Sequence, residues 1–301
     1  MRTFAIADID LDLDHGACRG WRLLNERRAD QHMLPITSAD AHLWLAHYDG
    51  IDDERLLAAY RALLNDAERA QEQRFHFARD RRRYLVTRAL VRTVLSRYVP
   101  IAPADWTFST NAYGCPAIAN AEAGDLSFNL SHTHSLIVLA VTRGRAVGVD
   151  VENVRAREVS IGIADRFFAP QEVAALNTVP PQEQQDRFFE YWTFKEAYIK
   201  ARGMGLSLPL DKFSFHYAGD RDVALAVDPS LNDDAARWHF WQFRPTADYL
   251  VALCAERNGD RPPAVTVRRT VPMRNDERFA VELLRTSDRT GLTSVASSFA
   301  D

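Results

Sequence analysis

The order of helical and strand-like segments constrains the fold of this chain more than any other feature. Residues 53–75 and 79–99 carry apolar side chains at helical spacing, and short strand patterns follow them. A helical region at 159–202, interrupted at Pro180 and Pro181, precedes a second set of strand patterns. Helices grouped ahead of hairpin-linked strands predict an α+β fold and argue against a parallel, doubly wound sheet. The predicted strands are 41–48, 105–110, 126–131, 135–141 and 145–154, then 213–217, 223–227, 237–243 and 248–256.

These segments divide into two sets of similar composition. The division predicts a pseudo-dimer of two similar α+β halves, each with a small, mainly antiparallel sheet packed against helices. We place the halves at residues 36–145 and 146–256. Residues 1–35 lack clear helix caps and are predicted to be an N-terminal extension. Residues 257–301 are rich in Arg, Asp, Ser and Thr, which predicts a linker and a loosely held C-terminal tail.

Composition and charge exclude several classes of protein. The net charge of −4 argues against a general nucleic-acid binder, because neutralising phosphates needs a basic surface. The three cysteines are odd in number and widely spaced, so neither a disulfide framework nor a zinc knuckle is predicted. The N-terminus is acidic where a signal peptide is basic, and no segment approaches the ~20 apolar residues of a membrane span. We expect a cytoplasmic protein that binds neither nucleic acid nor membrane.

The stretch GVDVE, residues 148–152, places two acids at the end of a predicted strand. Asp150 and Glu152 share one face of an extended chain, while Val149 and Val151 share the other. Two carboxylates on one face form half of a site for a hard cation such as Mg²⁺. The alternative is an amphipathic edge strand with two solvated acids.

A second charged group lies inside an aromatic helix. Glu196 and Lys200 are four residues apart and share a face, while Lys195 lies about 100° round the helix from Glu196. A solvated salt bridge is the alternative interpretation. A solvated salt bridge does not explain why aromatic side chains leave so little of the helix circumference polar. Charges inside such a helix favour a functional role. The neighbouring aromatic residues are Phe188, Phe189, Trp192, Phe194 and Tyr198.

The stretch FNLSHTHS, residues 128–135, ends a predicted strand in a turn rich in hydrogen-bond donors. Ser131, His132 and Thr133 suit the oxygens of a phosphate group. His132 and His134 also form an H-x-H pattern, but no third nitrogen or thiol ligand for zinc is evident. A structural histidine is the other interpretation.

Taken together, these stretches resemble the Sfp-type 4′-phosphopantetheinyl transferases over residues 66–255. The GxDxE motif followed about 40 residues later by WxxKEAxxK and a glycine-rich exit is the most specific part of the resemblance. The matching stretches, in chain order, are RFHFARDRRRYLVTRALVR, FSTNAYGCP, FNLSHT, GVDVE and FFEYWTFKEAYIKARGMGLSLPLDKF.

The resemblance implies a fold, a cofactor and a set of site residues. Members of the family are pseudo-dimers that bind coenzyme A between the halves with Mg²⁺ on the diphosphate; Mn²⁺ is the alternative ion. By this resemblance Lys200 contacts the phosphates, Lys195 acts at the diphosphate or the reacting oxygen, and Glu196 is catalytic. The metal ligands implied are Asp150, Glu152 and Glu196, and the residues implied to contact coenzyme A include Ser131, His132 and Asp150.

The sequence departs from the family pattern in the hairpin motif G-K-P. Cys115 stands where the family often has lysine, so a positive charge near the nucleotide is lost, although the backbone of the turn can still contact the base. An arginine group at 74–83 is the candidate replacement, and Arg83 is the residue we predict to bind the 3′-phosphate.

The implied reaction moves the phosphopantetheine arm of coenzyme A to a serine of an acyl or peptidyl carrier protein and releases adenosine 3′,5′-bisphosphate. The competing hypotheses are a module that binds coenzyme A without transfer, and another Mg²⁺-dependent nucleotide enzyme such as a pyrophosphatase. We expect an acidic carrier protein that docks on the arginine helix or on residues 151–167. We also expect a monomer, because a built-in pseudo-dimer needs no second chain.

Overall fold

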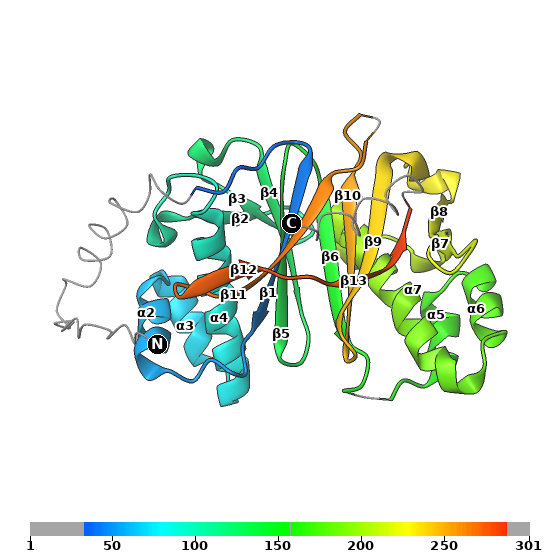
Figure 1. The fold of residues 1–301 in the computed structure, drawn as a ribbon, viewed down its shortest axis with the longest axis horizontal. Helices are drawn as coiled ribbons and strands as arrows, with labels where there is room; N and C mark the ends of the chain where they lie inside the picture. Colours follow the sequence, from blue (N-terminus) through cyan, green and yellow to red (C-terminus); the bar gives the residue numbers. More distant parts are fainter. Residues whose placement is uncertain (1–32, 157, 260, 288–301) are drawn as a thin grey trace, which may run out of the picture.

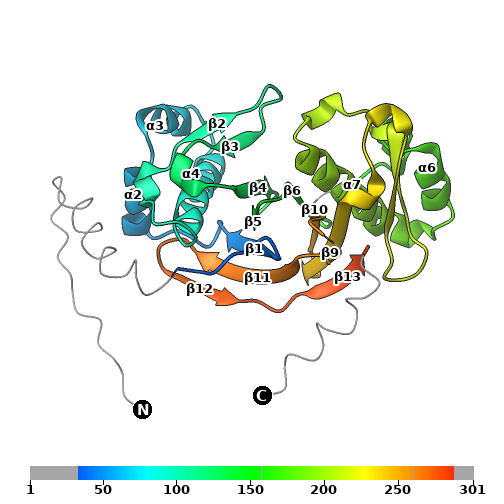
Figure 2. The ribbon, with the colours of Figure 1, turned by 90° about the horizontal axis from the view of Figure 1, so that it is seen from above.

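The structure is a computed structural model that describes residues 33–156, 158–259 and 261–287. Helices lie at both ends of the long axis and strands lie between them (Figure 1). Seen from above, each group of helices covers one side of the central strands (Figure 2). The predicted N-terminal extension lies largely outside the described residues. No helix in the described ranges is long and apolar enough to span a membrane.

The first half runs from β1 to β5. Its helices and strands are β1 (Asp40–His47), α2 (Glu54–Ala62), α3 (Asp66–Gln73), α4 (Ala78–Leu95), β2 (Phe108–Thr110), β3 (Pro116–Ile118), β4 (Leu126–His132) and β5 (Leu136–Arg143). Its short 3₁₀ helices are η1 (Pro103–Asp105) and η2 (Ala121–Ala123).

The second half runs from β6 to β10. Its helices and strands are β6 (Val147–Asn153), α5 (Ala164–Phe167), α6 (Pro170–Asn177), α7 (Pro181–Arg202), β7 (Phe213–His216), β8 (Ala224–Val227), β9 (Trp238–Thr246) and β10 (Tyr249–Glu256). Its short 3₁₀ helices are η3 (Ile161–Ile163), η4 (Gly205–Ser207), η5 (Leu210–Lys212), η6 (Pro229–Leu231) and η7 (Ala235–Arg237).

The two halves have the same topology. Each contains a strand, three helices, a two-stranded hairpin and two further strands, in that order. In both halves the last of the three sheet-forming strands lies between the other two, giving β1-β5-β4 and β6-β10-β9, and all these pairs are antiparallel. The predicted pseudo-dimer of two α+β halves is therefore confirmed.

Alternation along the strands separates three hydrophobic clusters. On β1, Trp44 and Ala46 pack into the cluster beneath the helices of the first half. Leu43 and Leu45 belong to a different cluster, which lies between the two sheets and includes Val149 and Val251. Each fully buried side chain of this kind contributes about 1.5–3 kcal/mol through the removal of apolar surface from water. The two sheets are thus joined by a continuous apolar seam.

The prediction of one helix over residues 53–75 is wrong. Two helices, α2 and α3, are separated at Leu63, Leu64 and Asn65. The Asn65 side chain accepts a hydrogen bond from the backbone N–H of Glu68 at 2.9 Å, and the Glu68 carboxylate accepts one from the N–H of Asn65 at 3.1 Å. This reciprocal capping box starts a new helix even though the apolar spacing continues across the break.

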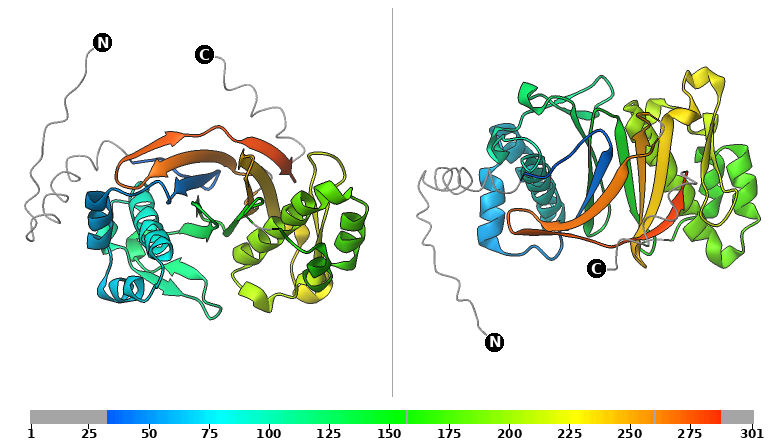
Figure 3. Two further views of the ribbon diagram at one scale, coloured as in Figure 1. Left: turned by 90° about the horizontal axis from the view of Figure 1, so that it is seen from below. Right: turned by 45° about the horizontal axis from the view of Figure 1, so that its top comes forward.

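The prediction of a linker and loose tail over residues 257–301 is also wrong for the part that the structure describes. Residues 264–286, here called the C-terminal strap, form three strands: β11 (Ala264–Val271), β12 (Asn275–Arg278) and β13 (Glu282–Thr286). The strap crosses both sheets (Figure 3). β11 pairs in parallel with β1, and β13 pairs antiparallel with β9. The alternating Val265 and Val267 signalled a strand that the polar composition obscured.

Side chains fasten the strap to helices of both halves. The Tyr60 hydroxyl on α2 donates a hydrogen bond to the carbonyl of Pro272 at 2.8 Å. At the other end, Arg285 on β13 pairs with Glu190 on α7 at 3.2 Å. Val267 is buried in the seam between the sheets. The strap therefore connects the two halves on one side of the molecule.

If the strap is an integral part of the fold, a charge at Val267 should destabilise the whole protein. We expect Val267→Asp to lower the free energy of unfolding by several kcal/mol, on the order of the cost of burying an unpaired polar group. The matched control is Ala264→Asp, which places the same charge at an exposed position of the same strand. Denaturant titrations measure both, and equal stability of the two variants would contradict an integral strap.

Candidate active site

β6 presents Asp150 to α7 and valines to the seam between the sheets. Val149 and Val151 are buried in that seam, while Asp150, only 5% exposed, faces α7. Glu152 is partly buried further along the strand. The sequence-based prediction that β6 separates acids from valines is therefore confirmed.

Asp150 lies at the centre of a cluster built from three elements. Its Oδ1 accepts hydrogen bonds from Lys200 Nζ on α7 at 2.7 Å and from Ser131 Oγ on β4 at 2.8 Å. Lys200 Nζ also contacts Ser131 Oγ at 2.9 Å and the carbonyl of Val149 at 3.1 Å. Ser131 belongs to the first half, and Asp150 and Lys200 belong to the second. The cluster therefore joins the halves.

The other carboxylate oxygen of Asp150 is buried and has no hydrogen-bond partner within the described residues. A buried acceptor without a partner is costly, so this atom is suited to a ligand that the cluster does not itself supply. A divalent cation is one such ligand.

Glu196 lies near Asp150 from the side of α7. Burial raises the pKa of the Glu196 carboxyl above its usual value, and the charge of Asp150 raises it further, while Lys200 opposes the shift. Among the residues that the structure describes, no three His, Cys, Asp or Glu side chains form a ready metal cluster. Neither the predicted set of Asp150, Glu152 and Glu196 nor an H-x-H zinc site is therefore preassembled.

A pocket with a volume of about 360 Å³ lies beside this cluster in the first half. Arg83 and His132, both predicted from the sequence, line it. Arg83 is also within 3.3 Å of Asp80. Partial desolvation lowers the pKa of His132, and the charges of Arg83 and Lys200 lower it further. The pocket thus combines a guanidinium group with an imidazole whose pKa lies below its usual value.

Sequence reasoning missed several residues of this pocket. Thr87 lies one helical turn beyond Arg83, and Arg88 stacks on the ring of Tyr84 at 5.1 Å. The i, i+4 spacing from Arg83 was the available signal. Asn129 lines the pocket and accepts a hydrogen bond from the Val149 N–H at 3.0 Å, which connects β4 to β6. The remaining lining residues are Phe75, Pro116, Phe128 and Leu130.

Cys115 lies in the β2–β3 hairpin and is not among the residues that line this pocket; its neighbour Pro116 is. The N–H of Cys115 donates to the Asn111 side chain at 2.9 Å. Asn111 in turn donates to the carbonyl of Gly203 at 2.7 Å. Gly203 ends α7 with a positive φ of 63°. The hairpin of the first half therefore contacts the glycine-rich exit of α7 in the second.

The prediction that Lys195 contacts a phosphate or a reacting oxygen is wrong. Its side chain is 0% exposed and points away from Asp150, into the second half. There Lys195 Nζ pairs with Glu172 at 2.7 Å and donates to the carbonyls of Leu210 and Phe213. Because Lys195 and Glu196 are consecutive on a helix, they cannot face the same side.

The close approach of α7 to β6 depends on a single glycine. A Cβ atom added to Gly148 would lie 2.0 Å from the carbonyl oxygen of Ala197 and 2.3 Å from the N of Ala201. No side chain fits in that space. Gly148 therefore lets the helix backbone touch the strand, and this contact places Lys200 within reach of Asp150.

Two family models together match most of the described chain. The model of the 4′-phosphopantetheinyl transferase superfamily matches residues 146–254, and the model of the N-terminal part of 4′-phosphopantetheinyl transferases matches residues 52–144. These ranges correspond closely to the two halves.

Two curated proteins are similar in sequence to this chain over most of their own length. The 4′-phosphopantetheinyl transferase HetI of Nostoc sp. is 32% identical over 76% of this chain and 93% of its own. The 4′-phosphopantetheinyl transferase Sfp of Bacillus subtilis is 32% identical over 69% of this chain and 88% of its own. Among solved structures, holo-[acyl-carrier-protein] synthase of Thermotoga maritima is similar with a TM-score of 0.31 and 20% identity, over 46% of this chain and 84% of its own.

The two matched halves and the curated relatives define the class of protein, and the chain belongs to the 4′-phosphopantetheinyl transferase superfamily. The sequence-based prediction of a phosphopantetheinyl transferase is confirmed.

A methyl group at Gly148 should separate α7 from β6 and disrupt the cluster. We expect Gly148→Ala to lower the rate of phosphopantetheine transfer about 100-fold, the effect of misplacing reacting groups by about 1 Å. The control is Gly50→Ala, where an added Cβ meets nothing within 4 Å. Transfer by the Gly148→Ala variant at the wild-type rate would show that this contact does not position the site.

Proposed function

We propose that this chain transfers the phosphopantetheine arm of coenzyme A to a serine hydroxyl on an acyl or peptidyl carrier protein. The observation that carries the proposal is the cluster of Asp150, Lys200 and Ser131 next to a pocket lined by Arg83 and His132. Positively charged side chains suited to phosphate groups, Arg83 and Lys200, lie near Asp150, whose buried Oδ2 has no hydrogen-bond partner within the described residues. Phosphoryl transfer requires that combination, since the protein mainly positions groups and neutralises charge.

The acids near Lys200 fit a divalent cation in part. Asp150 Oδ2 is buried and lacks a partner within the described ranges, and the charge of Asp150 raises the pKa of Glu196. Mg²⁺ commonly takes one or two carboxylates and completes its shell with water and substrate phosphates, so a full protein cluster is not needed. Asp150 and Glu152 on β6, together with Glu196 on α7, would hold the ion. When bound it neutralises charge on the diphosphate.

Basic side chains of both halves bind coenzyme A. Arg83 and His132 contact the 3′-phosphate of the adenosine in the pocket of the first half. Lys200 contacts the diphosphate, which brings the scissile bond to the junction of the halves. The Ser131 hydroxyl donates a hydrogen bond to Asp150 and so orients that carboxylate. The hairpin that carries Cys115 contributes backbone and not charge.

Glu196 takes the proton of the acceptor. The serine oxygen forms a bond to the phosphorus that carries the pantetheine arm, and the bond from that phosphorus to the bridging oxygen breaks. Adenosine 3′,5′-bisphosphate leaves, and the serine proton passes to the Glu196 carboxylate.

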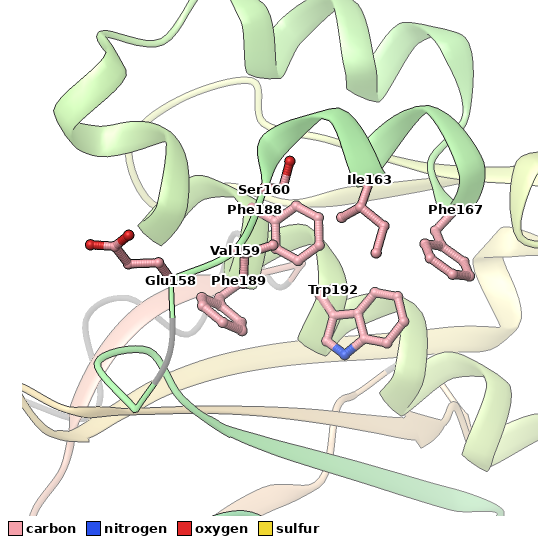
Figure 4. Close-up of a pocket in the computed structure, with 8 residues that line it drawn as sticks. All are labelled: Glu158, Val159, Ser160, Ile163, Phe167, Phe188, Phe189 and Trp192. Atoms are coloured by element: carbon pink, nitrogen blue, oxygen red, sulfur yellow. The ribbon is translucent and has the colours of Figure 1, made fainter.

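The carrier protein docks at a second, apolar pocket of about 200 Å³. Trp192 on α7, one helical turn before Glu196, forms one wall of it, and Ile163 and Phe167 form another (Figure 4). Ile163 is 39% exposed, which is high for a large apolar residue beside a pocket. The remaining lining residues are Glu158, Val159, Ser160, Phe188 and Phe189.

This pocket favours residues 151–167 over the arginine helix as the docking segment. Arg155 and Arg166 are exposed close to it in sequence and suit an acidic carrier. A carrier helix that inserts an apolar side chain here would present its serine near Glu196. One chain forms the cluster and both pockets, so we also infer that the enzyme acts as a monomer.

Removing either acid should abolish transfer without unfolding the protein. We expect Glu196→Gln and Asp150→Asn to lower the rate at least about 100-fold, the lower bound for loss of acid–base or metal-holding groups. Mass spectrometry of an apo carrier protein incubated with coenzyme A and Mg²⁺ measures the added arm. Glu183→Gln, an exposed acid on the same helix, is the control and should be unaffected.

The same assay separates the proposal from its competitors. Full transfer by Glu196→Gln or Asp150→Asn would overturn the assigned roles. Binding of coenzyme A by the wild type with no transfer to any apo carrier would favour a binding module. Release of nucleotide products without an acceptor would favour a pyrophosphatase.

A charge at Ile163 should weaken carrier binding alone. We expect Ile163→Asp to raise the KM for an apo carrier about 10-fold, since one well-placed apolar contact contributes 1–3 kcal/mol, while the KM for coenzyme A stays unchanged. Met273→Asp changes another exposed apolar residue, on the strap, and is the control. An unchanged carrier KM in Ile163→Asp would move the docking site elsewhere.

A further inference from the structure

Lys195 and Glu172 form a buried ion pair that the transfer reaction does not use. Lys195 Nζ lies 2.7 Å from Glu172 Oε2, 2.7 Å from the carbonyl oxygen of Leu210 and 2.8 Å from that of Phe213. These contacts use all three donors of the ammonium group. It also lies 4.3 Å from the centre of the Phe213 ring. Lys195 is therefore fully engaged inside the second half.

Glu172 is equally engaged. Its Oε2 also accepts a hydrogen bond from the N–H of Ala169 at 2.9 Å, and its Oε1 accepts one from the N–H of Phe215 at 2.8 Å. Ala169 precedes α6 and Phe215 lies in β7. The pair thus ties α7 to the start of α6, to η5 and to β7.

Such a pair is a poor source of stability. Both side chains are 0% exposed, so the pair carries the cost of removing two charges from water. An apolar pair of similar volume is often as stable as a buried ion pair or more so. What the ion pair provides in addition is a defined orientation of the segments that it joins, because each charge-assisted hydrogen bond holds only over a narrow range of distance and angle.

This orientation concerns α7, which is held from two sides. On one side Gly148 of β6 touches the helix backbone at Ala197 and Ala201. On another side Lys195 is fixed by three partners. Glu196 follows Lys195 directly, so a rotation or slide at Lys195 moves Glu196 by the same amount.

We propose that Lys195 and Glu172 are a positioning pair, which sets the rotation and axial position of α7 so that Glu196 and Lys200 meet Asp150. The proposal rests on the role of Glu196 in the proposed function. It assigns the two adjacent charges of the Lys195-Glu196 motif to different tasks: the lysine anchors the helix and the glutamate acts on the substrate.

Steady-state kinetics of the full chain, with coenzyme A, Mg²⁺ and an apo carrier protein, test the pair. We expect Lys195→Met and Glu172→Gln each to lower kcat about 100-fold, the effect of a shift of about 1 Å, with the KM for coenzyme A nearly unchanged. The double variant Lys195→Met/Glu172→Gln should lose no more than the worse single variant, because both changes remove one interaction. If Glu172→Gln keeps the wild-type kcat while Lys195→Met is inactive, Lys195 acts on its own and the proposal fails.

A second double variant separates positioning from stability. Lys195→Met/Glu172→Leu removes both buried charges but also the hydrogen bonds to the backbone groups of Ala169, Leu210, Phe213 and Phe215, so we expect a folded protein with a lower Tm than the wild type. Its kcat should remain about 100-fold low, because the direction supplied by the hydrogen bonds is absent. A stable variant with wild-type kcat would overturn the proposal. This measurement also covers the case in which Lys195→Met alone does not fold.

A surface pair provides the matched control. Lys212 and Asp228 lie 3.7 Å apart and are both substantially exposed, in the same half as Lys195. Lys212→Met and Asp228→Asn should leave kcat unchanged. Wild-type protein that transfers no arm to any apo carrier would overturn the proposed function instead, so the two failures give different results.

Discussion

The candidate active site depends on the contact between α7 and β6 at Gly148. The strand carries the acid Asp150, the helix carries Glu196 and Lys200, and the absence of a side chain at Gly148 brings the two backbones together. Ser131 reaches this junction from the first half. A site made in this way is sensitive to small shifts of the helix, because the Lys200–Asp150 contact of 2.7 Å has little tolerance.

Several devices hold the two halves in one arrangement. The apolar seam between the sheets joins them broadly, with Leu43, Val149 and Val251 in one cluster. The hydrogen bond from Asn111 to Gly203 connects the hairpin of one half to the exit of α7 in the other. The C-terminal strap pairs with an edge strand of each sheet. The pocket residues Arg83 and His132 of the first half and the acids of the second are therefore held in a fixed geometry.

Much of the fold and site could be predicted because the signals are local. Alternation along GVDVE separated Asp150 from the valines, and the four-residue spacing of Glu196 and Lys200 placed both on one helix face. Arg83 and His132, both predicted to contact the 3′-phosphate, line one pocket. The strap was missed because parallel pairing of β11 with β1 joins segments more than 200 residues apart in sequence, and polar composition masked its short alternation.

The sequence by itself determined the two-half α+β plan, the family and the acids on β6, because periodicity and motif spacing are written along the chain. Only the tertiary structure decided the task of Lys195. The side chain of its neighbour Glu196 points about 100° further round the helix. Segments distant in sequence decide which groups each of the two side chains meets. Glu172, Leu210 and Phe213 surround one charge, while Asp150 faces the other. Residue type and spacing cannot distinguish these surroundings, because they arise only when the elements pack.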